Sequence, residues 1–237
     1  MNRTKRRIAL LLVSLAPFSV RAESTCYGTV KDGRIANAVQ LPRSGTNYSA
    51  YSSLAGVLGR NYLHSKVHEL VLAAYAALET SAPNKVFVYG ETGSASGGRF
   101  RPHRTHQNGL SVDFMVPVID KTGRSVPLPT SVGNKWGYDI EFDATAKFGD
   151  YTIDFEALGE HLYQLHKLAR SRKVGISLVI LDVAFLSKLF RTTHGEYLKR
   201  NLPFLKGKSW WRHDEHYHVD FSVPCKPLER RKKEVPH

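Results

Sequence analysis

Apolar residues at helical spacing predict two long helices. The first covers residues 66–80, with Ser65 as a candidate N-cap and Pro83 beyond its end. The second runs from Asp154, its N-cap, to about Arg172. Its inner face is predicted to carry Phe155, Leu158, Leu162, Leu165 and Leu168.

Four segments are predicted as strands. Residues 85–90 and 177–183 are short apolar runs, whereas residues 110–116 and 216–223 alternate between apolar and polar positions, as half-buried strands do. Helices and strands are mixed along the chain without regular βαβ repetition. The sequence therefore predicts an α+β fold with a central antiparallel sheet, flanked by helices and long loops.

The other segments show little periodicity. Residues 26–60 are rich in Gly, Ser, Asn and Tyr and are expected to be irregular, and residues 117–150 are expected to be loops with a turn near 121–123. Short helical pieces are expected within residues 184–202. Because no linker or internal repeat divides the chain, we expect a single domain over residues 23–225.

The N-terminus is typical of a secretory signal over residues 1–22. Residues 3–7 are strongly basic, residues 8–20 are mostly apolar, and Val20 and Ala22 offer small residues at the −3 and −1 positions of a cleavage site. The apolar run is shorter than the roughly 18–20 residues that span a bilayer, so no transmembrane segment is predicted. A buried N-terminal helix is the alternative.

The net charge of the chain suggests a polyanion-binding protein, so the distribution of that charge along the sequence matters. The chain has 237 residues, with 34 Lys+Arg against 21 Asp+Glu and a net charge of +13. Loss of residues 1–22 removes five basic and no acidic residues and leaves +8. The basic tail at 226–237 holds five basic and two acidic residues, so residues 23–225 carry only +5. The excess charge is concentrated at the two ends, which weakens the case for nucleic acid as a partner.

The two cysteines lie at opposite ends of the predicted domain, as Cys26 and Cys225. In an oxidising compartment, this placement favours a disulfide that closes the domain. Two free buried thiols are the alternative. Two distant cysteines exclude a zinc site of the finger type, which needs clustered thiolates.

Five of the 11 histidines gather in two short segments, at 103–106 and 213–218. On a strand, side chains two residues apart point to the same face, so His216 and His218 share one face with Asp220 and Ser222. Tyr217 and its apolar neighbours then face the core. Two imidazoles on one polar face form half of a metal site.

The first segment supplies the other half. If the two alternating strands are neighbours, His106, Asp113 and His218 converge on one ion, and two imidazoles with one carboxylate and an open fourth position describe a catalytic zinc site. Solvated or packed histidines are the alternative. His161 and His166 are five residues apart, the wrong spacing for one helix face, and are expected at the surface or its boundary.

Residues 103–113 (HRTHQNGLSVD) and 213–218 (HDEHYH) resemble the two signature segments of the penicillin-insensitive murein endopeptidases. The resemblance to this family also includes three other segments, which are Cys26-Tyr-Gly, Leu41-Pro42 and the Trp-Trp pair before the last histidines. The resemblance covers roughly residues 26–225. It also extends to a wider group of zinc peptidases that includes lysostaphin-type enzymes, D-alanyl-D-alanine peptidases and the hedgehog N-terminal domain.

The resemblance implies one zinc ion per chain and hydrolysis of the D-alanyl–meso-diaminopimelyl cross-link of peptidoglycan in the periplasm. It implies His106, Asp113 and His218 as zinc ligands and His216 as the catalytic base. His213 and His103 match additional site histidines, and His213, if protonated, would stabilise the developing oxyanion.

Glu215 leaves the choice of base open. It lies three residues before His218, where the related carboxypeptidases and dipeptidases carry a glutamate base. Regular strand geometry places Glu215 on the face opposite His218, whereas a bulge at the strand start would redirect it. His216 faces the ligand side under regular geometry, so we expect it to be the base.

Three alternatives compete with this interpretation. A D,D-carboxypeptidase or an L,D-type cleavage would use the same polymer and the same metal. A basic module that binds nucleic acid or another polyanion would use the charge and the aromatic pair Trp210 and Trp211. A non-catalytic zinc protein would need the ligands but would not need His216 and His213.

Overall fold

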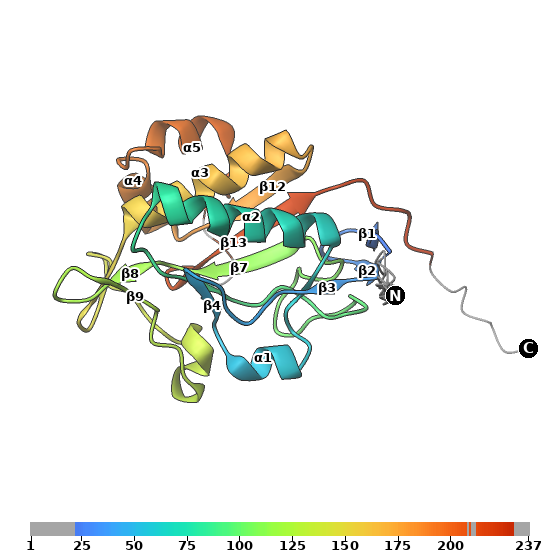
Figure 1. Cartoon of the computed structure of the whole chain (residues 1–237), viewed down its shortest axis with the longest axis horizontal. Coiled ribbons are helices and arrows are strands. Elements are labelled where there is room, and N and C mark those ends of the chain that lie inside the picture. Colours follow the sequence, from blue (N-terminus) through green and yellow to red (C-terminus); the bar gives the residue numbers. More distant parts are fainter. Residues whose placement is uncertain (1–21, 208, 210–211, 230–237) are drawn as a thin grey trace, which may run out of the picture.

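The computed structural model describes residues 22–207, 209 and 212–229 (Figure 1). The predicted signal up to residue 21, both Trp210 and Trp211, and the end of the basic tail from residue 230 lie outside the described residues.

A five-stranded sheet forms the centre of the protein. Its strand order is β12 (Gly175–Ile180), β13 (His216–Ser222), β7 (Ser111–Met115), β6 (Phe87–Tyr89) and β4 (Tyr48–Ala50). All neighbouring strands are antiparallel except the β4–β6 pair at one edge. The predicted α+β fold with a central antiparallel sheet is confirmed.

Two long helices cover the apolar face of this sheet, α2 (Ser65–Ser81) and α3 (Phe155–Ser171) (Figure 1). Tyr75 of α2 packs against Phe87 of β6, with ring centroids 6.1 Å apart. Alternate residues of β7 and β13, such as Phe114 and Tyr217, point toward these helices and are buried. The opposite face of the same two strands is left for the polar side chains.

The helix starts show how the local sequence sets the ends of each helix. Asp154 caps α3, as predicted, by accepting a hydrogen bond from the backbone N–H of Ala157. The predicted N-cap of α2 is wrong by one residue, because His64 caps it by accepting from the N–H of Lys66. The hydroxyl of Ser65 accepts instead from the backbone N–H of Ser24.

Two shorter helices, α4 (Val183–Leu189) and α5 (Gly195–Asn201), lie beside α3 and confirm the helical pieces expected there (Figure 1). The strand predicted over 177–183 is displaced toward the N-terminus, since β12 ends at Ile180 and Asp182 already caps α4. Strands β7 and β13 are also not half-buried as predicted, because every residue of both strands is buried except Ser222 at the end of β13.

The segments predicted as irregular contain short strands. They are β1 (Thr25–Gly28), β2 (Gly33–Ala36), β3 (Val39–Gln40), β5 (Tyr62–Leu63), β8 (Val118–Ile119), β9 (Ser125–Val126), β10 (Lys147–Phe148) and β11 (Tyr151–Ile153), with helix α1 (Ser53–Val57) and the 3-10 turn η1 (Val132–Gly137) between them. Elements of two to six residues are too short to produce a visible hydrophobic period. The predicted turn near 121–123 is confirmed, because the backbone N–H of Gly123 donates to the carbonyl of Asp120.

His161 contradicts the expectation of a surface or boundary position, since its side chain is 0% exposed. Its ring stacks on Tyr75 at 5.3 Å, meets Phe114 edge-on at 4.7 Å, and Nδ1 is hydrogen-bonded to the hydroxyl of Tyr217. Burial lowers the pKa of His161 to about 3, so the imidazole is neutral in the core. His166 lies at the boundary, as expected, where it contacts the hydroxyl of Tyr197.

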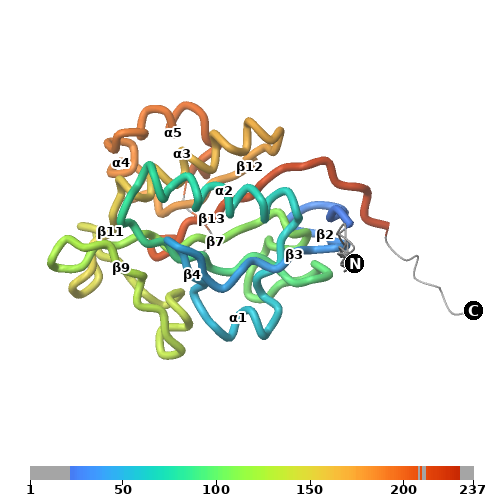
Figure 2. Tube along the Cα trace, in the orientation of Figure 1, coloured from blue at the N-terminus to red at the C-terminus, as the bar shows by residue number. Residues whose placement is uncertain are grey.

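Cys26 and Cys225 form the predicted disulfide, which joins two segments with a sequence separation of 199 residues. In the trace, the first and last described parts of the chain run side by side (Figure 2). The backbone N–H of Lys226 donates to the carbonyl of Cys26, which adds a second link there. No helix among the described residues is long and apolar enough to cross a membrane.

Candidate metal centre and active site

The two alternating strands are neighbours, as the predicted metal site requires. Strand β13 pairs with β7 so that His218 lies opposite Asp113 and His216 lies opposite Met115. The side chains of His216 and His218 are each 3% exposed. The sheet therefore presents both imidazoles and the carboxylate on its polar face.

Three imidazole nitrogens lie within 4.0 Å of one oxygen of Asp113. Oδ1 lies 2.8 Å from His218 Nδ1, 3.2 Å from His106 Nε2 and 4.0 Å from His216 Nε2. Burial alone would raise the pKa of Asp113, but the surrounding histidines hold it well below its usual range. Asp113 is therefore an ionised, fully buried carboxylate.

The other oxygen of Asp113 has a different environment. Oδ2 accepts a hydrogen bond of 2.9 Å from the hydroxyl of Tyr138, whose own oxygen accepts from the backbone N–H of Glu91. His103 Nδ1 is 3.7 Å from the same Oδ2. Oδ2 thus already has a protein donor, whereas Oδ1 faces the nitrogens of His106 and His218.

A loop before β7 positions His106. Its backbone has a φ of 66°, and Gly109 follows with a φ of 76°. A Cβ on Gly109 would lie 2.5 Å from the side chain of Ile35 and 2.8 Å from the backbone nitrogen of His64. Only glycine fits this turn, which brings His106 beneath the sheet.

The hydrogen bonds of His106 fix its tautomer. Nδ1 is 3.0 Å from the carbonyl oxygen of Thr92, which can only accept, so Nδ1 carries the proton. Burial lowers the pKa of the ring, so Nε2 keeps its lone pair. That atom is buried, has no hydrogen-bond partner among the described residues, and faces Asp113 Oδ1. A lone pair turned toward a carboxylate is the arrangement of two ligands around a cation.

His218 is held in a similar way. Its Nε2 lies 2.8 Å from Asp220 Oδ1, which also accepts a 2.6 Å hydrogen bond from the hydroxyl of Ser111. Burial opposes a charged ring, but Asp220 and Asp113 raise the pKa of His218 to about 10. The two carboxylates thus favour positive charge at this position, whether as a proton or as a metal ion.

His103 approaches the same carboxylate from the other side. Its Nε2 lies 2.6 Å from Glu91, which Arg60 also pairs with and which accepts from the hydroxyl of Tyr51. The potential ligand atoms of His103, His106 and Asp113 all lie within 4.8 Å of one another. His103, predicted as an accessory residue, is therefore close enough to be considered as a ligand.

The remaining predicted residues form a second group at the start of β13. His216 Nδ1 is 2.9 Å from Glu215 Oε1, and the ring of His213 is 4.6 Å from that of His216. Burial lowers the pKa of His216 to about 4 and raises that of Glu215 to about 7. Because β13 begins at His216, Glu215 is outside the regular strand and its carboxylate bonds the His216 ring.

Sequence reasoning missed Tyr138 and Glu91. Tyr138 follows the 3-10 turn η1, in a region without periodicity, and Glu91 follows the short strand β6. No motif links either residue to the histidine segments. Only the folded chain brings them to Asp113 and His103.

The family model of penicillin-insensitive murein endopeptidase matches residues 26–236. The match covers nearly the whole described chain and includes every residue of the site. A search among curated proteins finds no match. The predicted resemblance and the predicted activity on peptidoglycan are confirmed.

Proposed function

This chain belongs to the penicillin-insensitive murein endopeptidases, and we propose that it is a zinc-dependent member that cleaves D-alanyl–meso-diaminopimelyl cross-links. The observation that supports a bound metal is the buried lone pair of His106 Nε2, an atom that lies 3.2 Å from Asp113 Oδ1. Without a cation between them, two electron-rich atoms would face each other in a buried site, at a cost in free energy.

We assign His106, Asp113 and His218 as the ligands. The nitrogens of His106 and His218 both face Oδ1, whereas His103 faces Oδ2, which already accepts from Tyr138. His218 also has the carboxylate partner that orients a ligating imidazole, because its second nitrogen contacts Asp220. His103, bonded to Glu91, is then a neighbour that contacts substrate or supports the site.

Two imidazoles and one carboxylate form the ligand set of catalytic zinc sites that keep a position open for water or substrate. Bound there, zinc lowers the pKa of water toward about 7 and polarises the scissile carbonyl. No serine nucleophile is required, so β-lactams, which acylate serine, have no residue to attack.

His216 serves as the general base in this proposal. Glu215 Oε1 accepts a hydrogen bond from Nδ1–H, so the lone pair of the ring is on Nε2, which lies 4.0 Å from Asp113 Oδ1. Nε2 takes the proton of the attacking water and delivers it to the leaving amine. Glu215 positions His216, and His213, adjacent to that ring, stabilises the oxyanion when protonated.

Comparing His216→Ala with Glu215→Gln tests these roles. We expect His216→Ala to lose about 10²–10⁴-fold in kcat, the usual contribution of a general base, with its zinc content unchanged. Glu215→Gln keeps an acceptor near Nδ1 and should lose much less. Near-normal turnover in zinc-loaded His216→Ala would overturn the assignment and favour Glu215.

Export to the periplasm is part of the proposal. The predicted signal at 1–22, the disulfide between Cys26 and Cys225, and the murein substrate of the family support it. The enzyme would then be one domain over residues 23–225 with a basic tail at 226–237.

Digestion of purified cross-linked murein tests the proposed reaction. We expect dimeric muropeptides to disappear and monomers to accumulate in equal measure, with the activity abolished by a chelator and restored by zinc. Unchanged dimers in the presence of zinc-loaded protein would reject the endopeptidase function. Loss of only the terminal D-alanine would identify a carboxypeptidase instead.

A further inference from the structure

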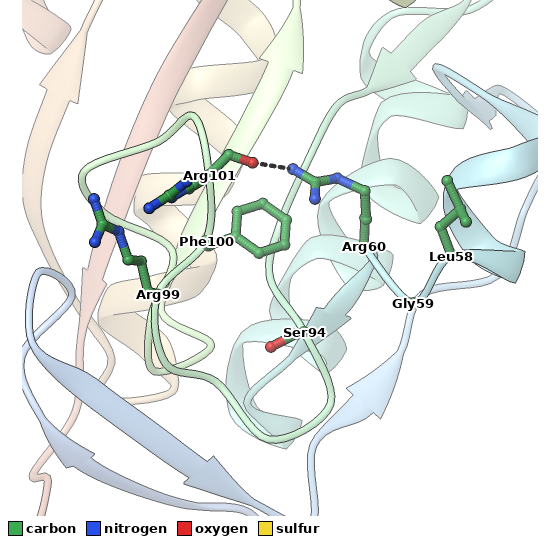
Figure 3. A pocket seen from close by; sticks show the side chains of 7 residues that line it. All are labelled: Leu58, Gly59, Arg60, Ser94, Arg99, Phe100 and Arg101. Atoms are coloured by element: carbon green, nitrogen blue, oxygen red, sulfur yellow. Dashed lines mark hydrogen bonds between the residues drawn. The ribbon is translucent and has the colours of Figure 1, made fainter.

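Seven residues, Phe100 among them, line a pocket of about 360 Å³ (Figure 3). Phe100 also contacts the histidine cluster formed by His103 and His106. Its buried ring lies 5.7 Å from the ring of His106 and 5.8 Å from that of His103. A group bound in this pocket would therefore be close to a bond that is cleaved at Asp113.

The pocket combines apolar and cationic walls. Leu58, 60% exposed after the end of α1, lines it together with Phe100. Arg99 and Arg101 bring two exposed guanidinium groups, which extend on the side of Phe100 away from Arg60 and Leu58 (Figure 3).

These two arginines differ from the third arginine of the pocket. Arg60 is neutralised by Glu91 and stacks over the Phe100 ring at 4.1 Å. Neither Arg99 nor Arg101 has a carboxylate partner anywhere in residues 22–207, 209 and 212–229. Two uncompensated positive charges on one loop favour the binding of an anion.

The loop that carries Arg99 and Arg101 is held in place by the rest of the fold. Arg60 donates a 2.8 Å hydrogen bond to the carbonyl of Arg101. The backbone N–H of Gly98 donates to the carbonyls of Gly33 and Gln107, at 3.0 and 2.8 Å. The arginines thus project from an ordered wall, so binding would require little reordering of the backbone.

We propose that this pocket binds the free carboxylate of the diaminopimelyl residue whose amine belongs to the scissile amide. The inference rests on the proposed function, because it places the cleaved bond at Asp113. The diaminopimelyl residue has an aliphatic chain and a carboxylate on the carbon next to the scissile nitrogen. The aliphatic chain matches Leu58 and Phe100, and the carboxylate matches the guanidinium groups of Arg99 and Arg101.

The position of the carboxylate sets what this contact requires. Its carbon is two bonds from the scissile nitrogen and about 2.5 Å from it, so the long side chains of Arg99 and Arg101 have to reach the carboxylate past the edge of Phe100. The pocket would then select cross-links whose diaminopimelyl carboxylate is free over those in which it is amidated.

Binding and cleavage assays together test this subsite. The binding probe is the stem tetrapeptide released by cleavage, with its diaminopimelyl carboxylate either free or amidated, titrated calorimetrically into the full chain. The variant is Arg99→Gln/Arg101→Gln. The control, Arg172→Gln/Arg191→Gln, removes the same charge from exposed arginines beside α3 and α4, across the sheet.

We expect the free acid to bind the Arg99→Gln/Arg101→Gln variant about tenfold more weakly than the wild type or the control, as for two partly solvated ion pairs. Amidation should weaken binding to the wild type by a similar factor and should change little in that variant. KM for cross-linked dimers should rise with little change in kcat.

Equal binding of the free acid by the wild type and the Arg99→Gln/Arg101→Gln variant would overturn the subsite. So would an equal loss on amidation in both proteins. Product binding requires no catalysis, so failure of the proposed hydrolysis appears separately, as intact dimers in the wild-type digestion.

Discussion

The burial of the His161 imidazole predicts how the free energy of unfolding depends on pH. It is 0% exposed, and burial lowers its pKa from 6.5 to about 3. In the unfolded chain the same group titrates near its ordinary value of about 6.5. Between about pH 3 and pH 6.5, His161 is therefore protonated in the unfolded chain but neutral in the folded protein.

The direction of the effect follows from this difference. Above pH 6.5 both states are neutral at this position, and His161 makes no pH-dependent contribution. As the pH falls below 6.5 the unfolded state is favoured by about 1.4 kcal/mol per pH unit, until the folded state is also protonated near pH 3. Between pH 7 and pH 5 the loss attributable to His161 is about 2 kcal/mol.

The test compares wild type with His161→Gln by urea unfolding at pH 7 and pH 5. Glutamine does not titrate and keeps an acceptor for the hydroxyl of Tyr217, which contacts His161 Nδ1 in the wild type. We expect the loss of unfolding free energy between these pH values to be about 2 kcal/mol smaller in His161→Gln. Equal pH dependence in the two proteins would refute the reasoning, because all other titrating groups are shared.

Two further predictions concern the metal site and the disulfide. Asp220→Asn weakens the partner of His218 Nε2 and should lower zinc affinity about 10–100-fold in a chelator competition, whereas unchanged affinity would show that Asp220 does not orient the ligand. Replacing Cys26 and Cys225 by serine opens a loop with a sequence separation of 199 residues and should cost about 5 kcal/mol in denaturant unfolding by the chain-entropy model. A loss below about 1 kcal/mol would mean that the ends stay together without the bridge.

The parts of the fold that could be predicted are those with a long period or a short-range signal. Helix α3 begins after Asp154, as predicted, because its cap and its apolar stripe are both local. The alternation that predicts β7 and β13 is local in the same way. Their pairing, the condition that the predicted metal site requires, joins His218 to Asp113 across 105 positions of the sequence.

The parts that could not be predicted depend on contacts between distant segments. His161 has the spacing of a surface histidine, yet Tyr75, Phe114 and Tyr217 from three other elements enclose it. Tyr138 reaches Asp113 from a loop without periodicity. Glu215 lies just before β13, which begins at His216 as predicted, and its carboxylate contacts the His216 ring.

The choice of ligands is the central claim, and anomalous diffraction from crystals of the zinc-loaded protein tests it most directly. We predict one peak per chain at the zinc edge, bonded to His106 Nε2, Asp113 Oδ1 and His218 Nδ1, with His216 unligated beside it. A peak bonded to His103 in place of His218, or no peak at Asp113, would contradict the assignment.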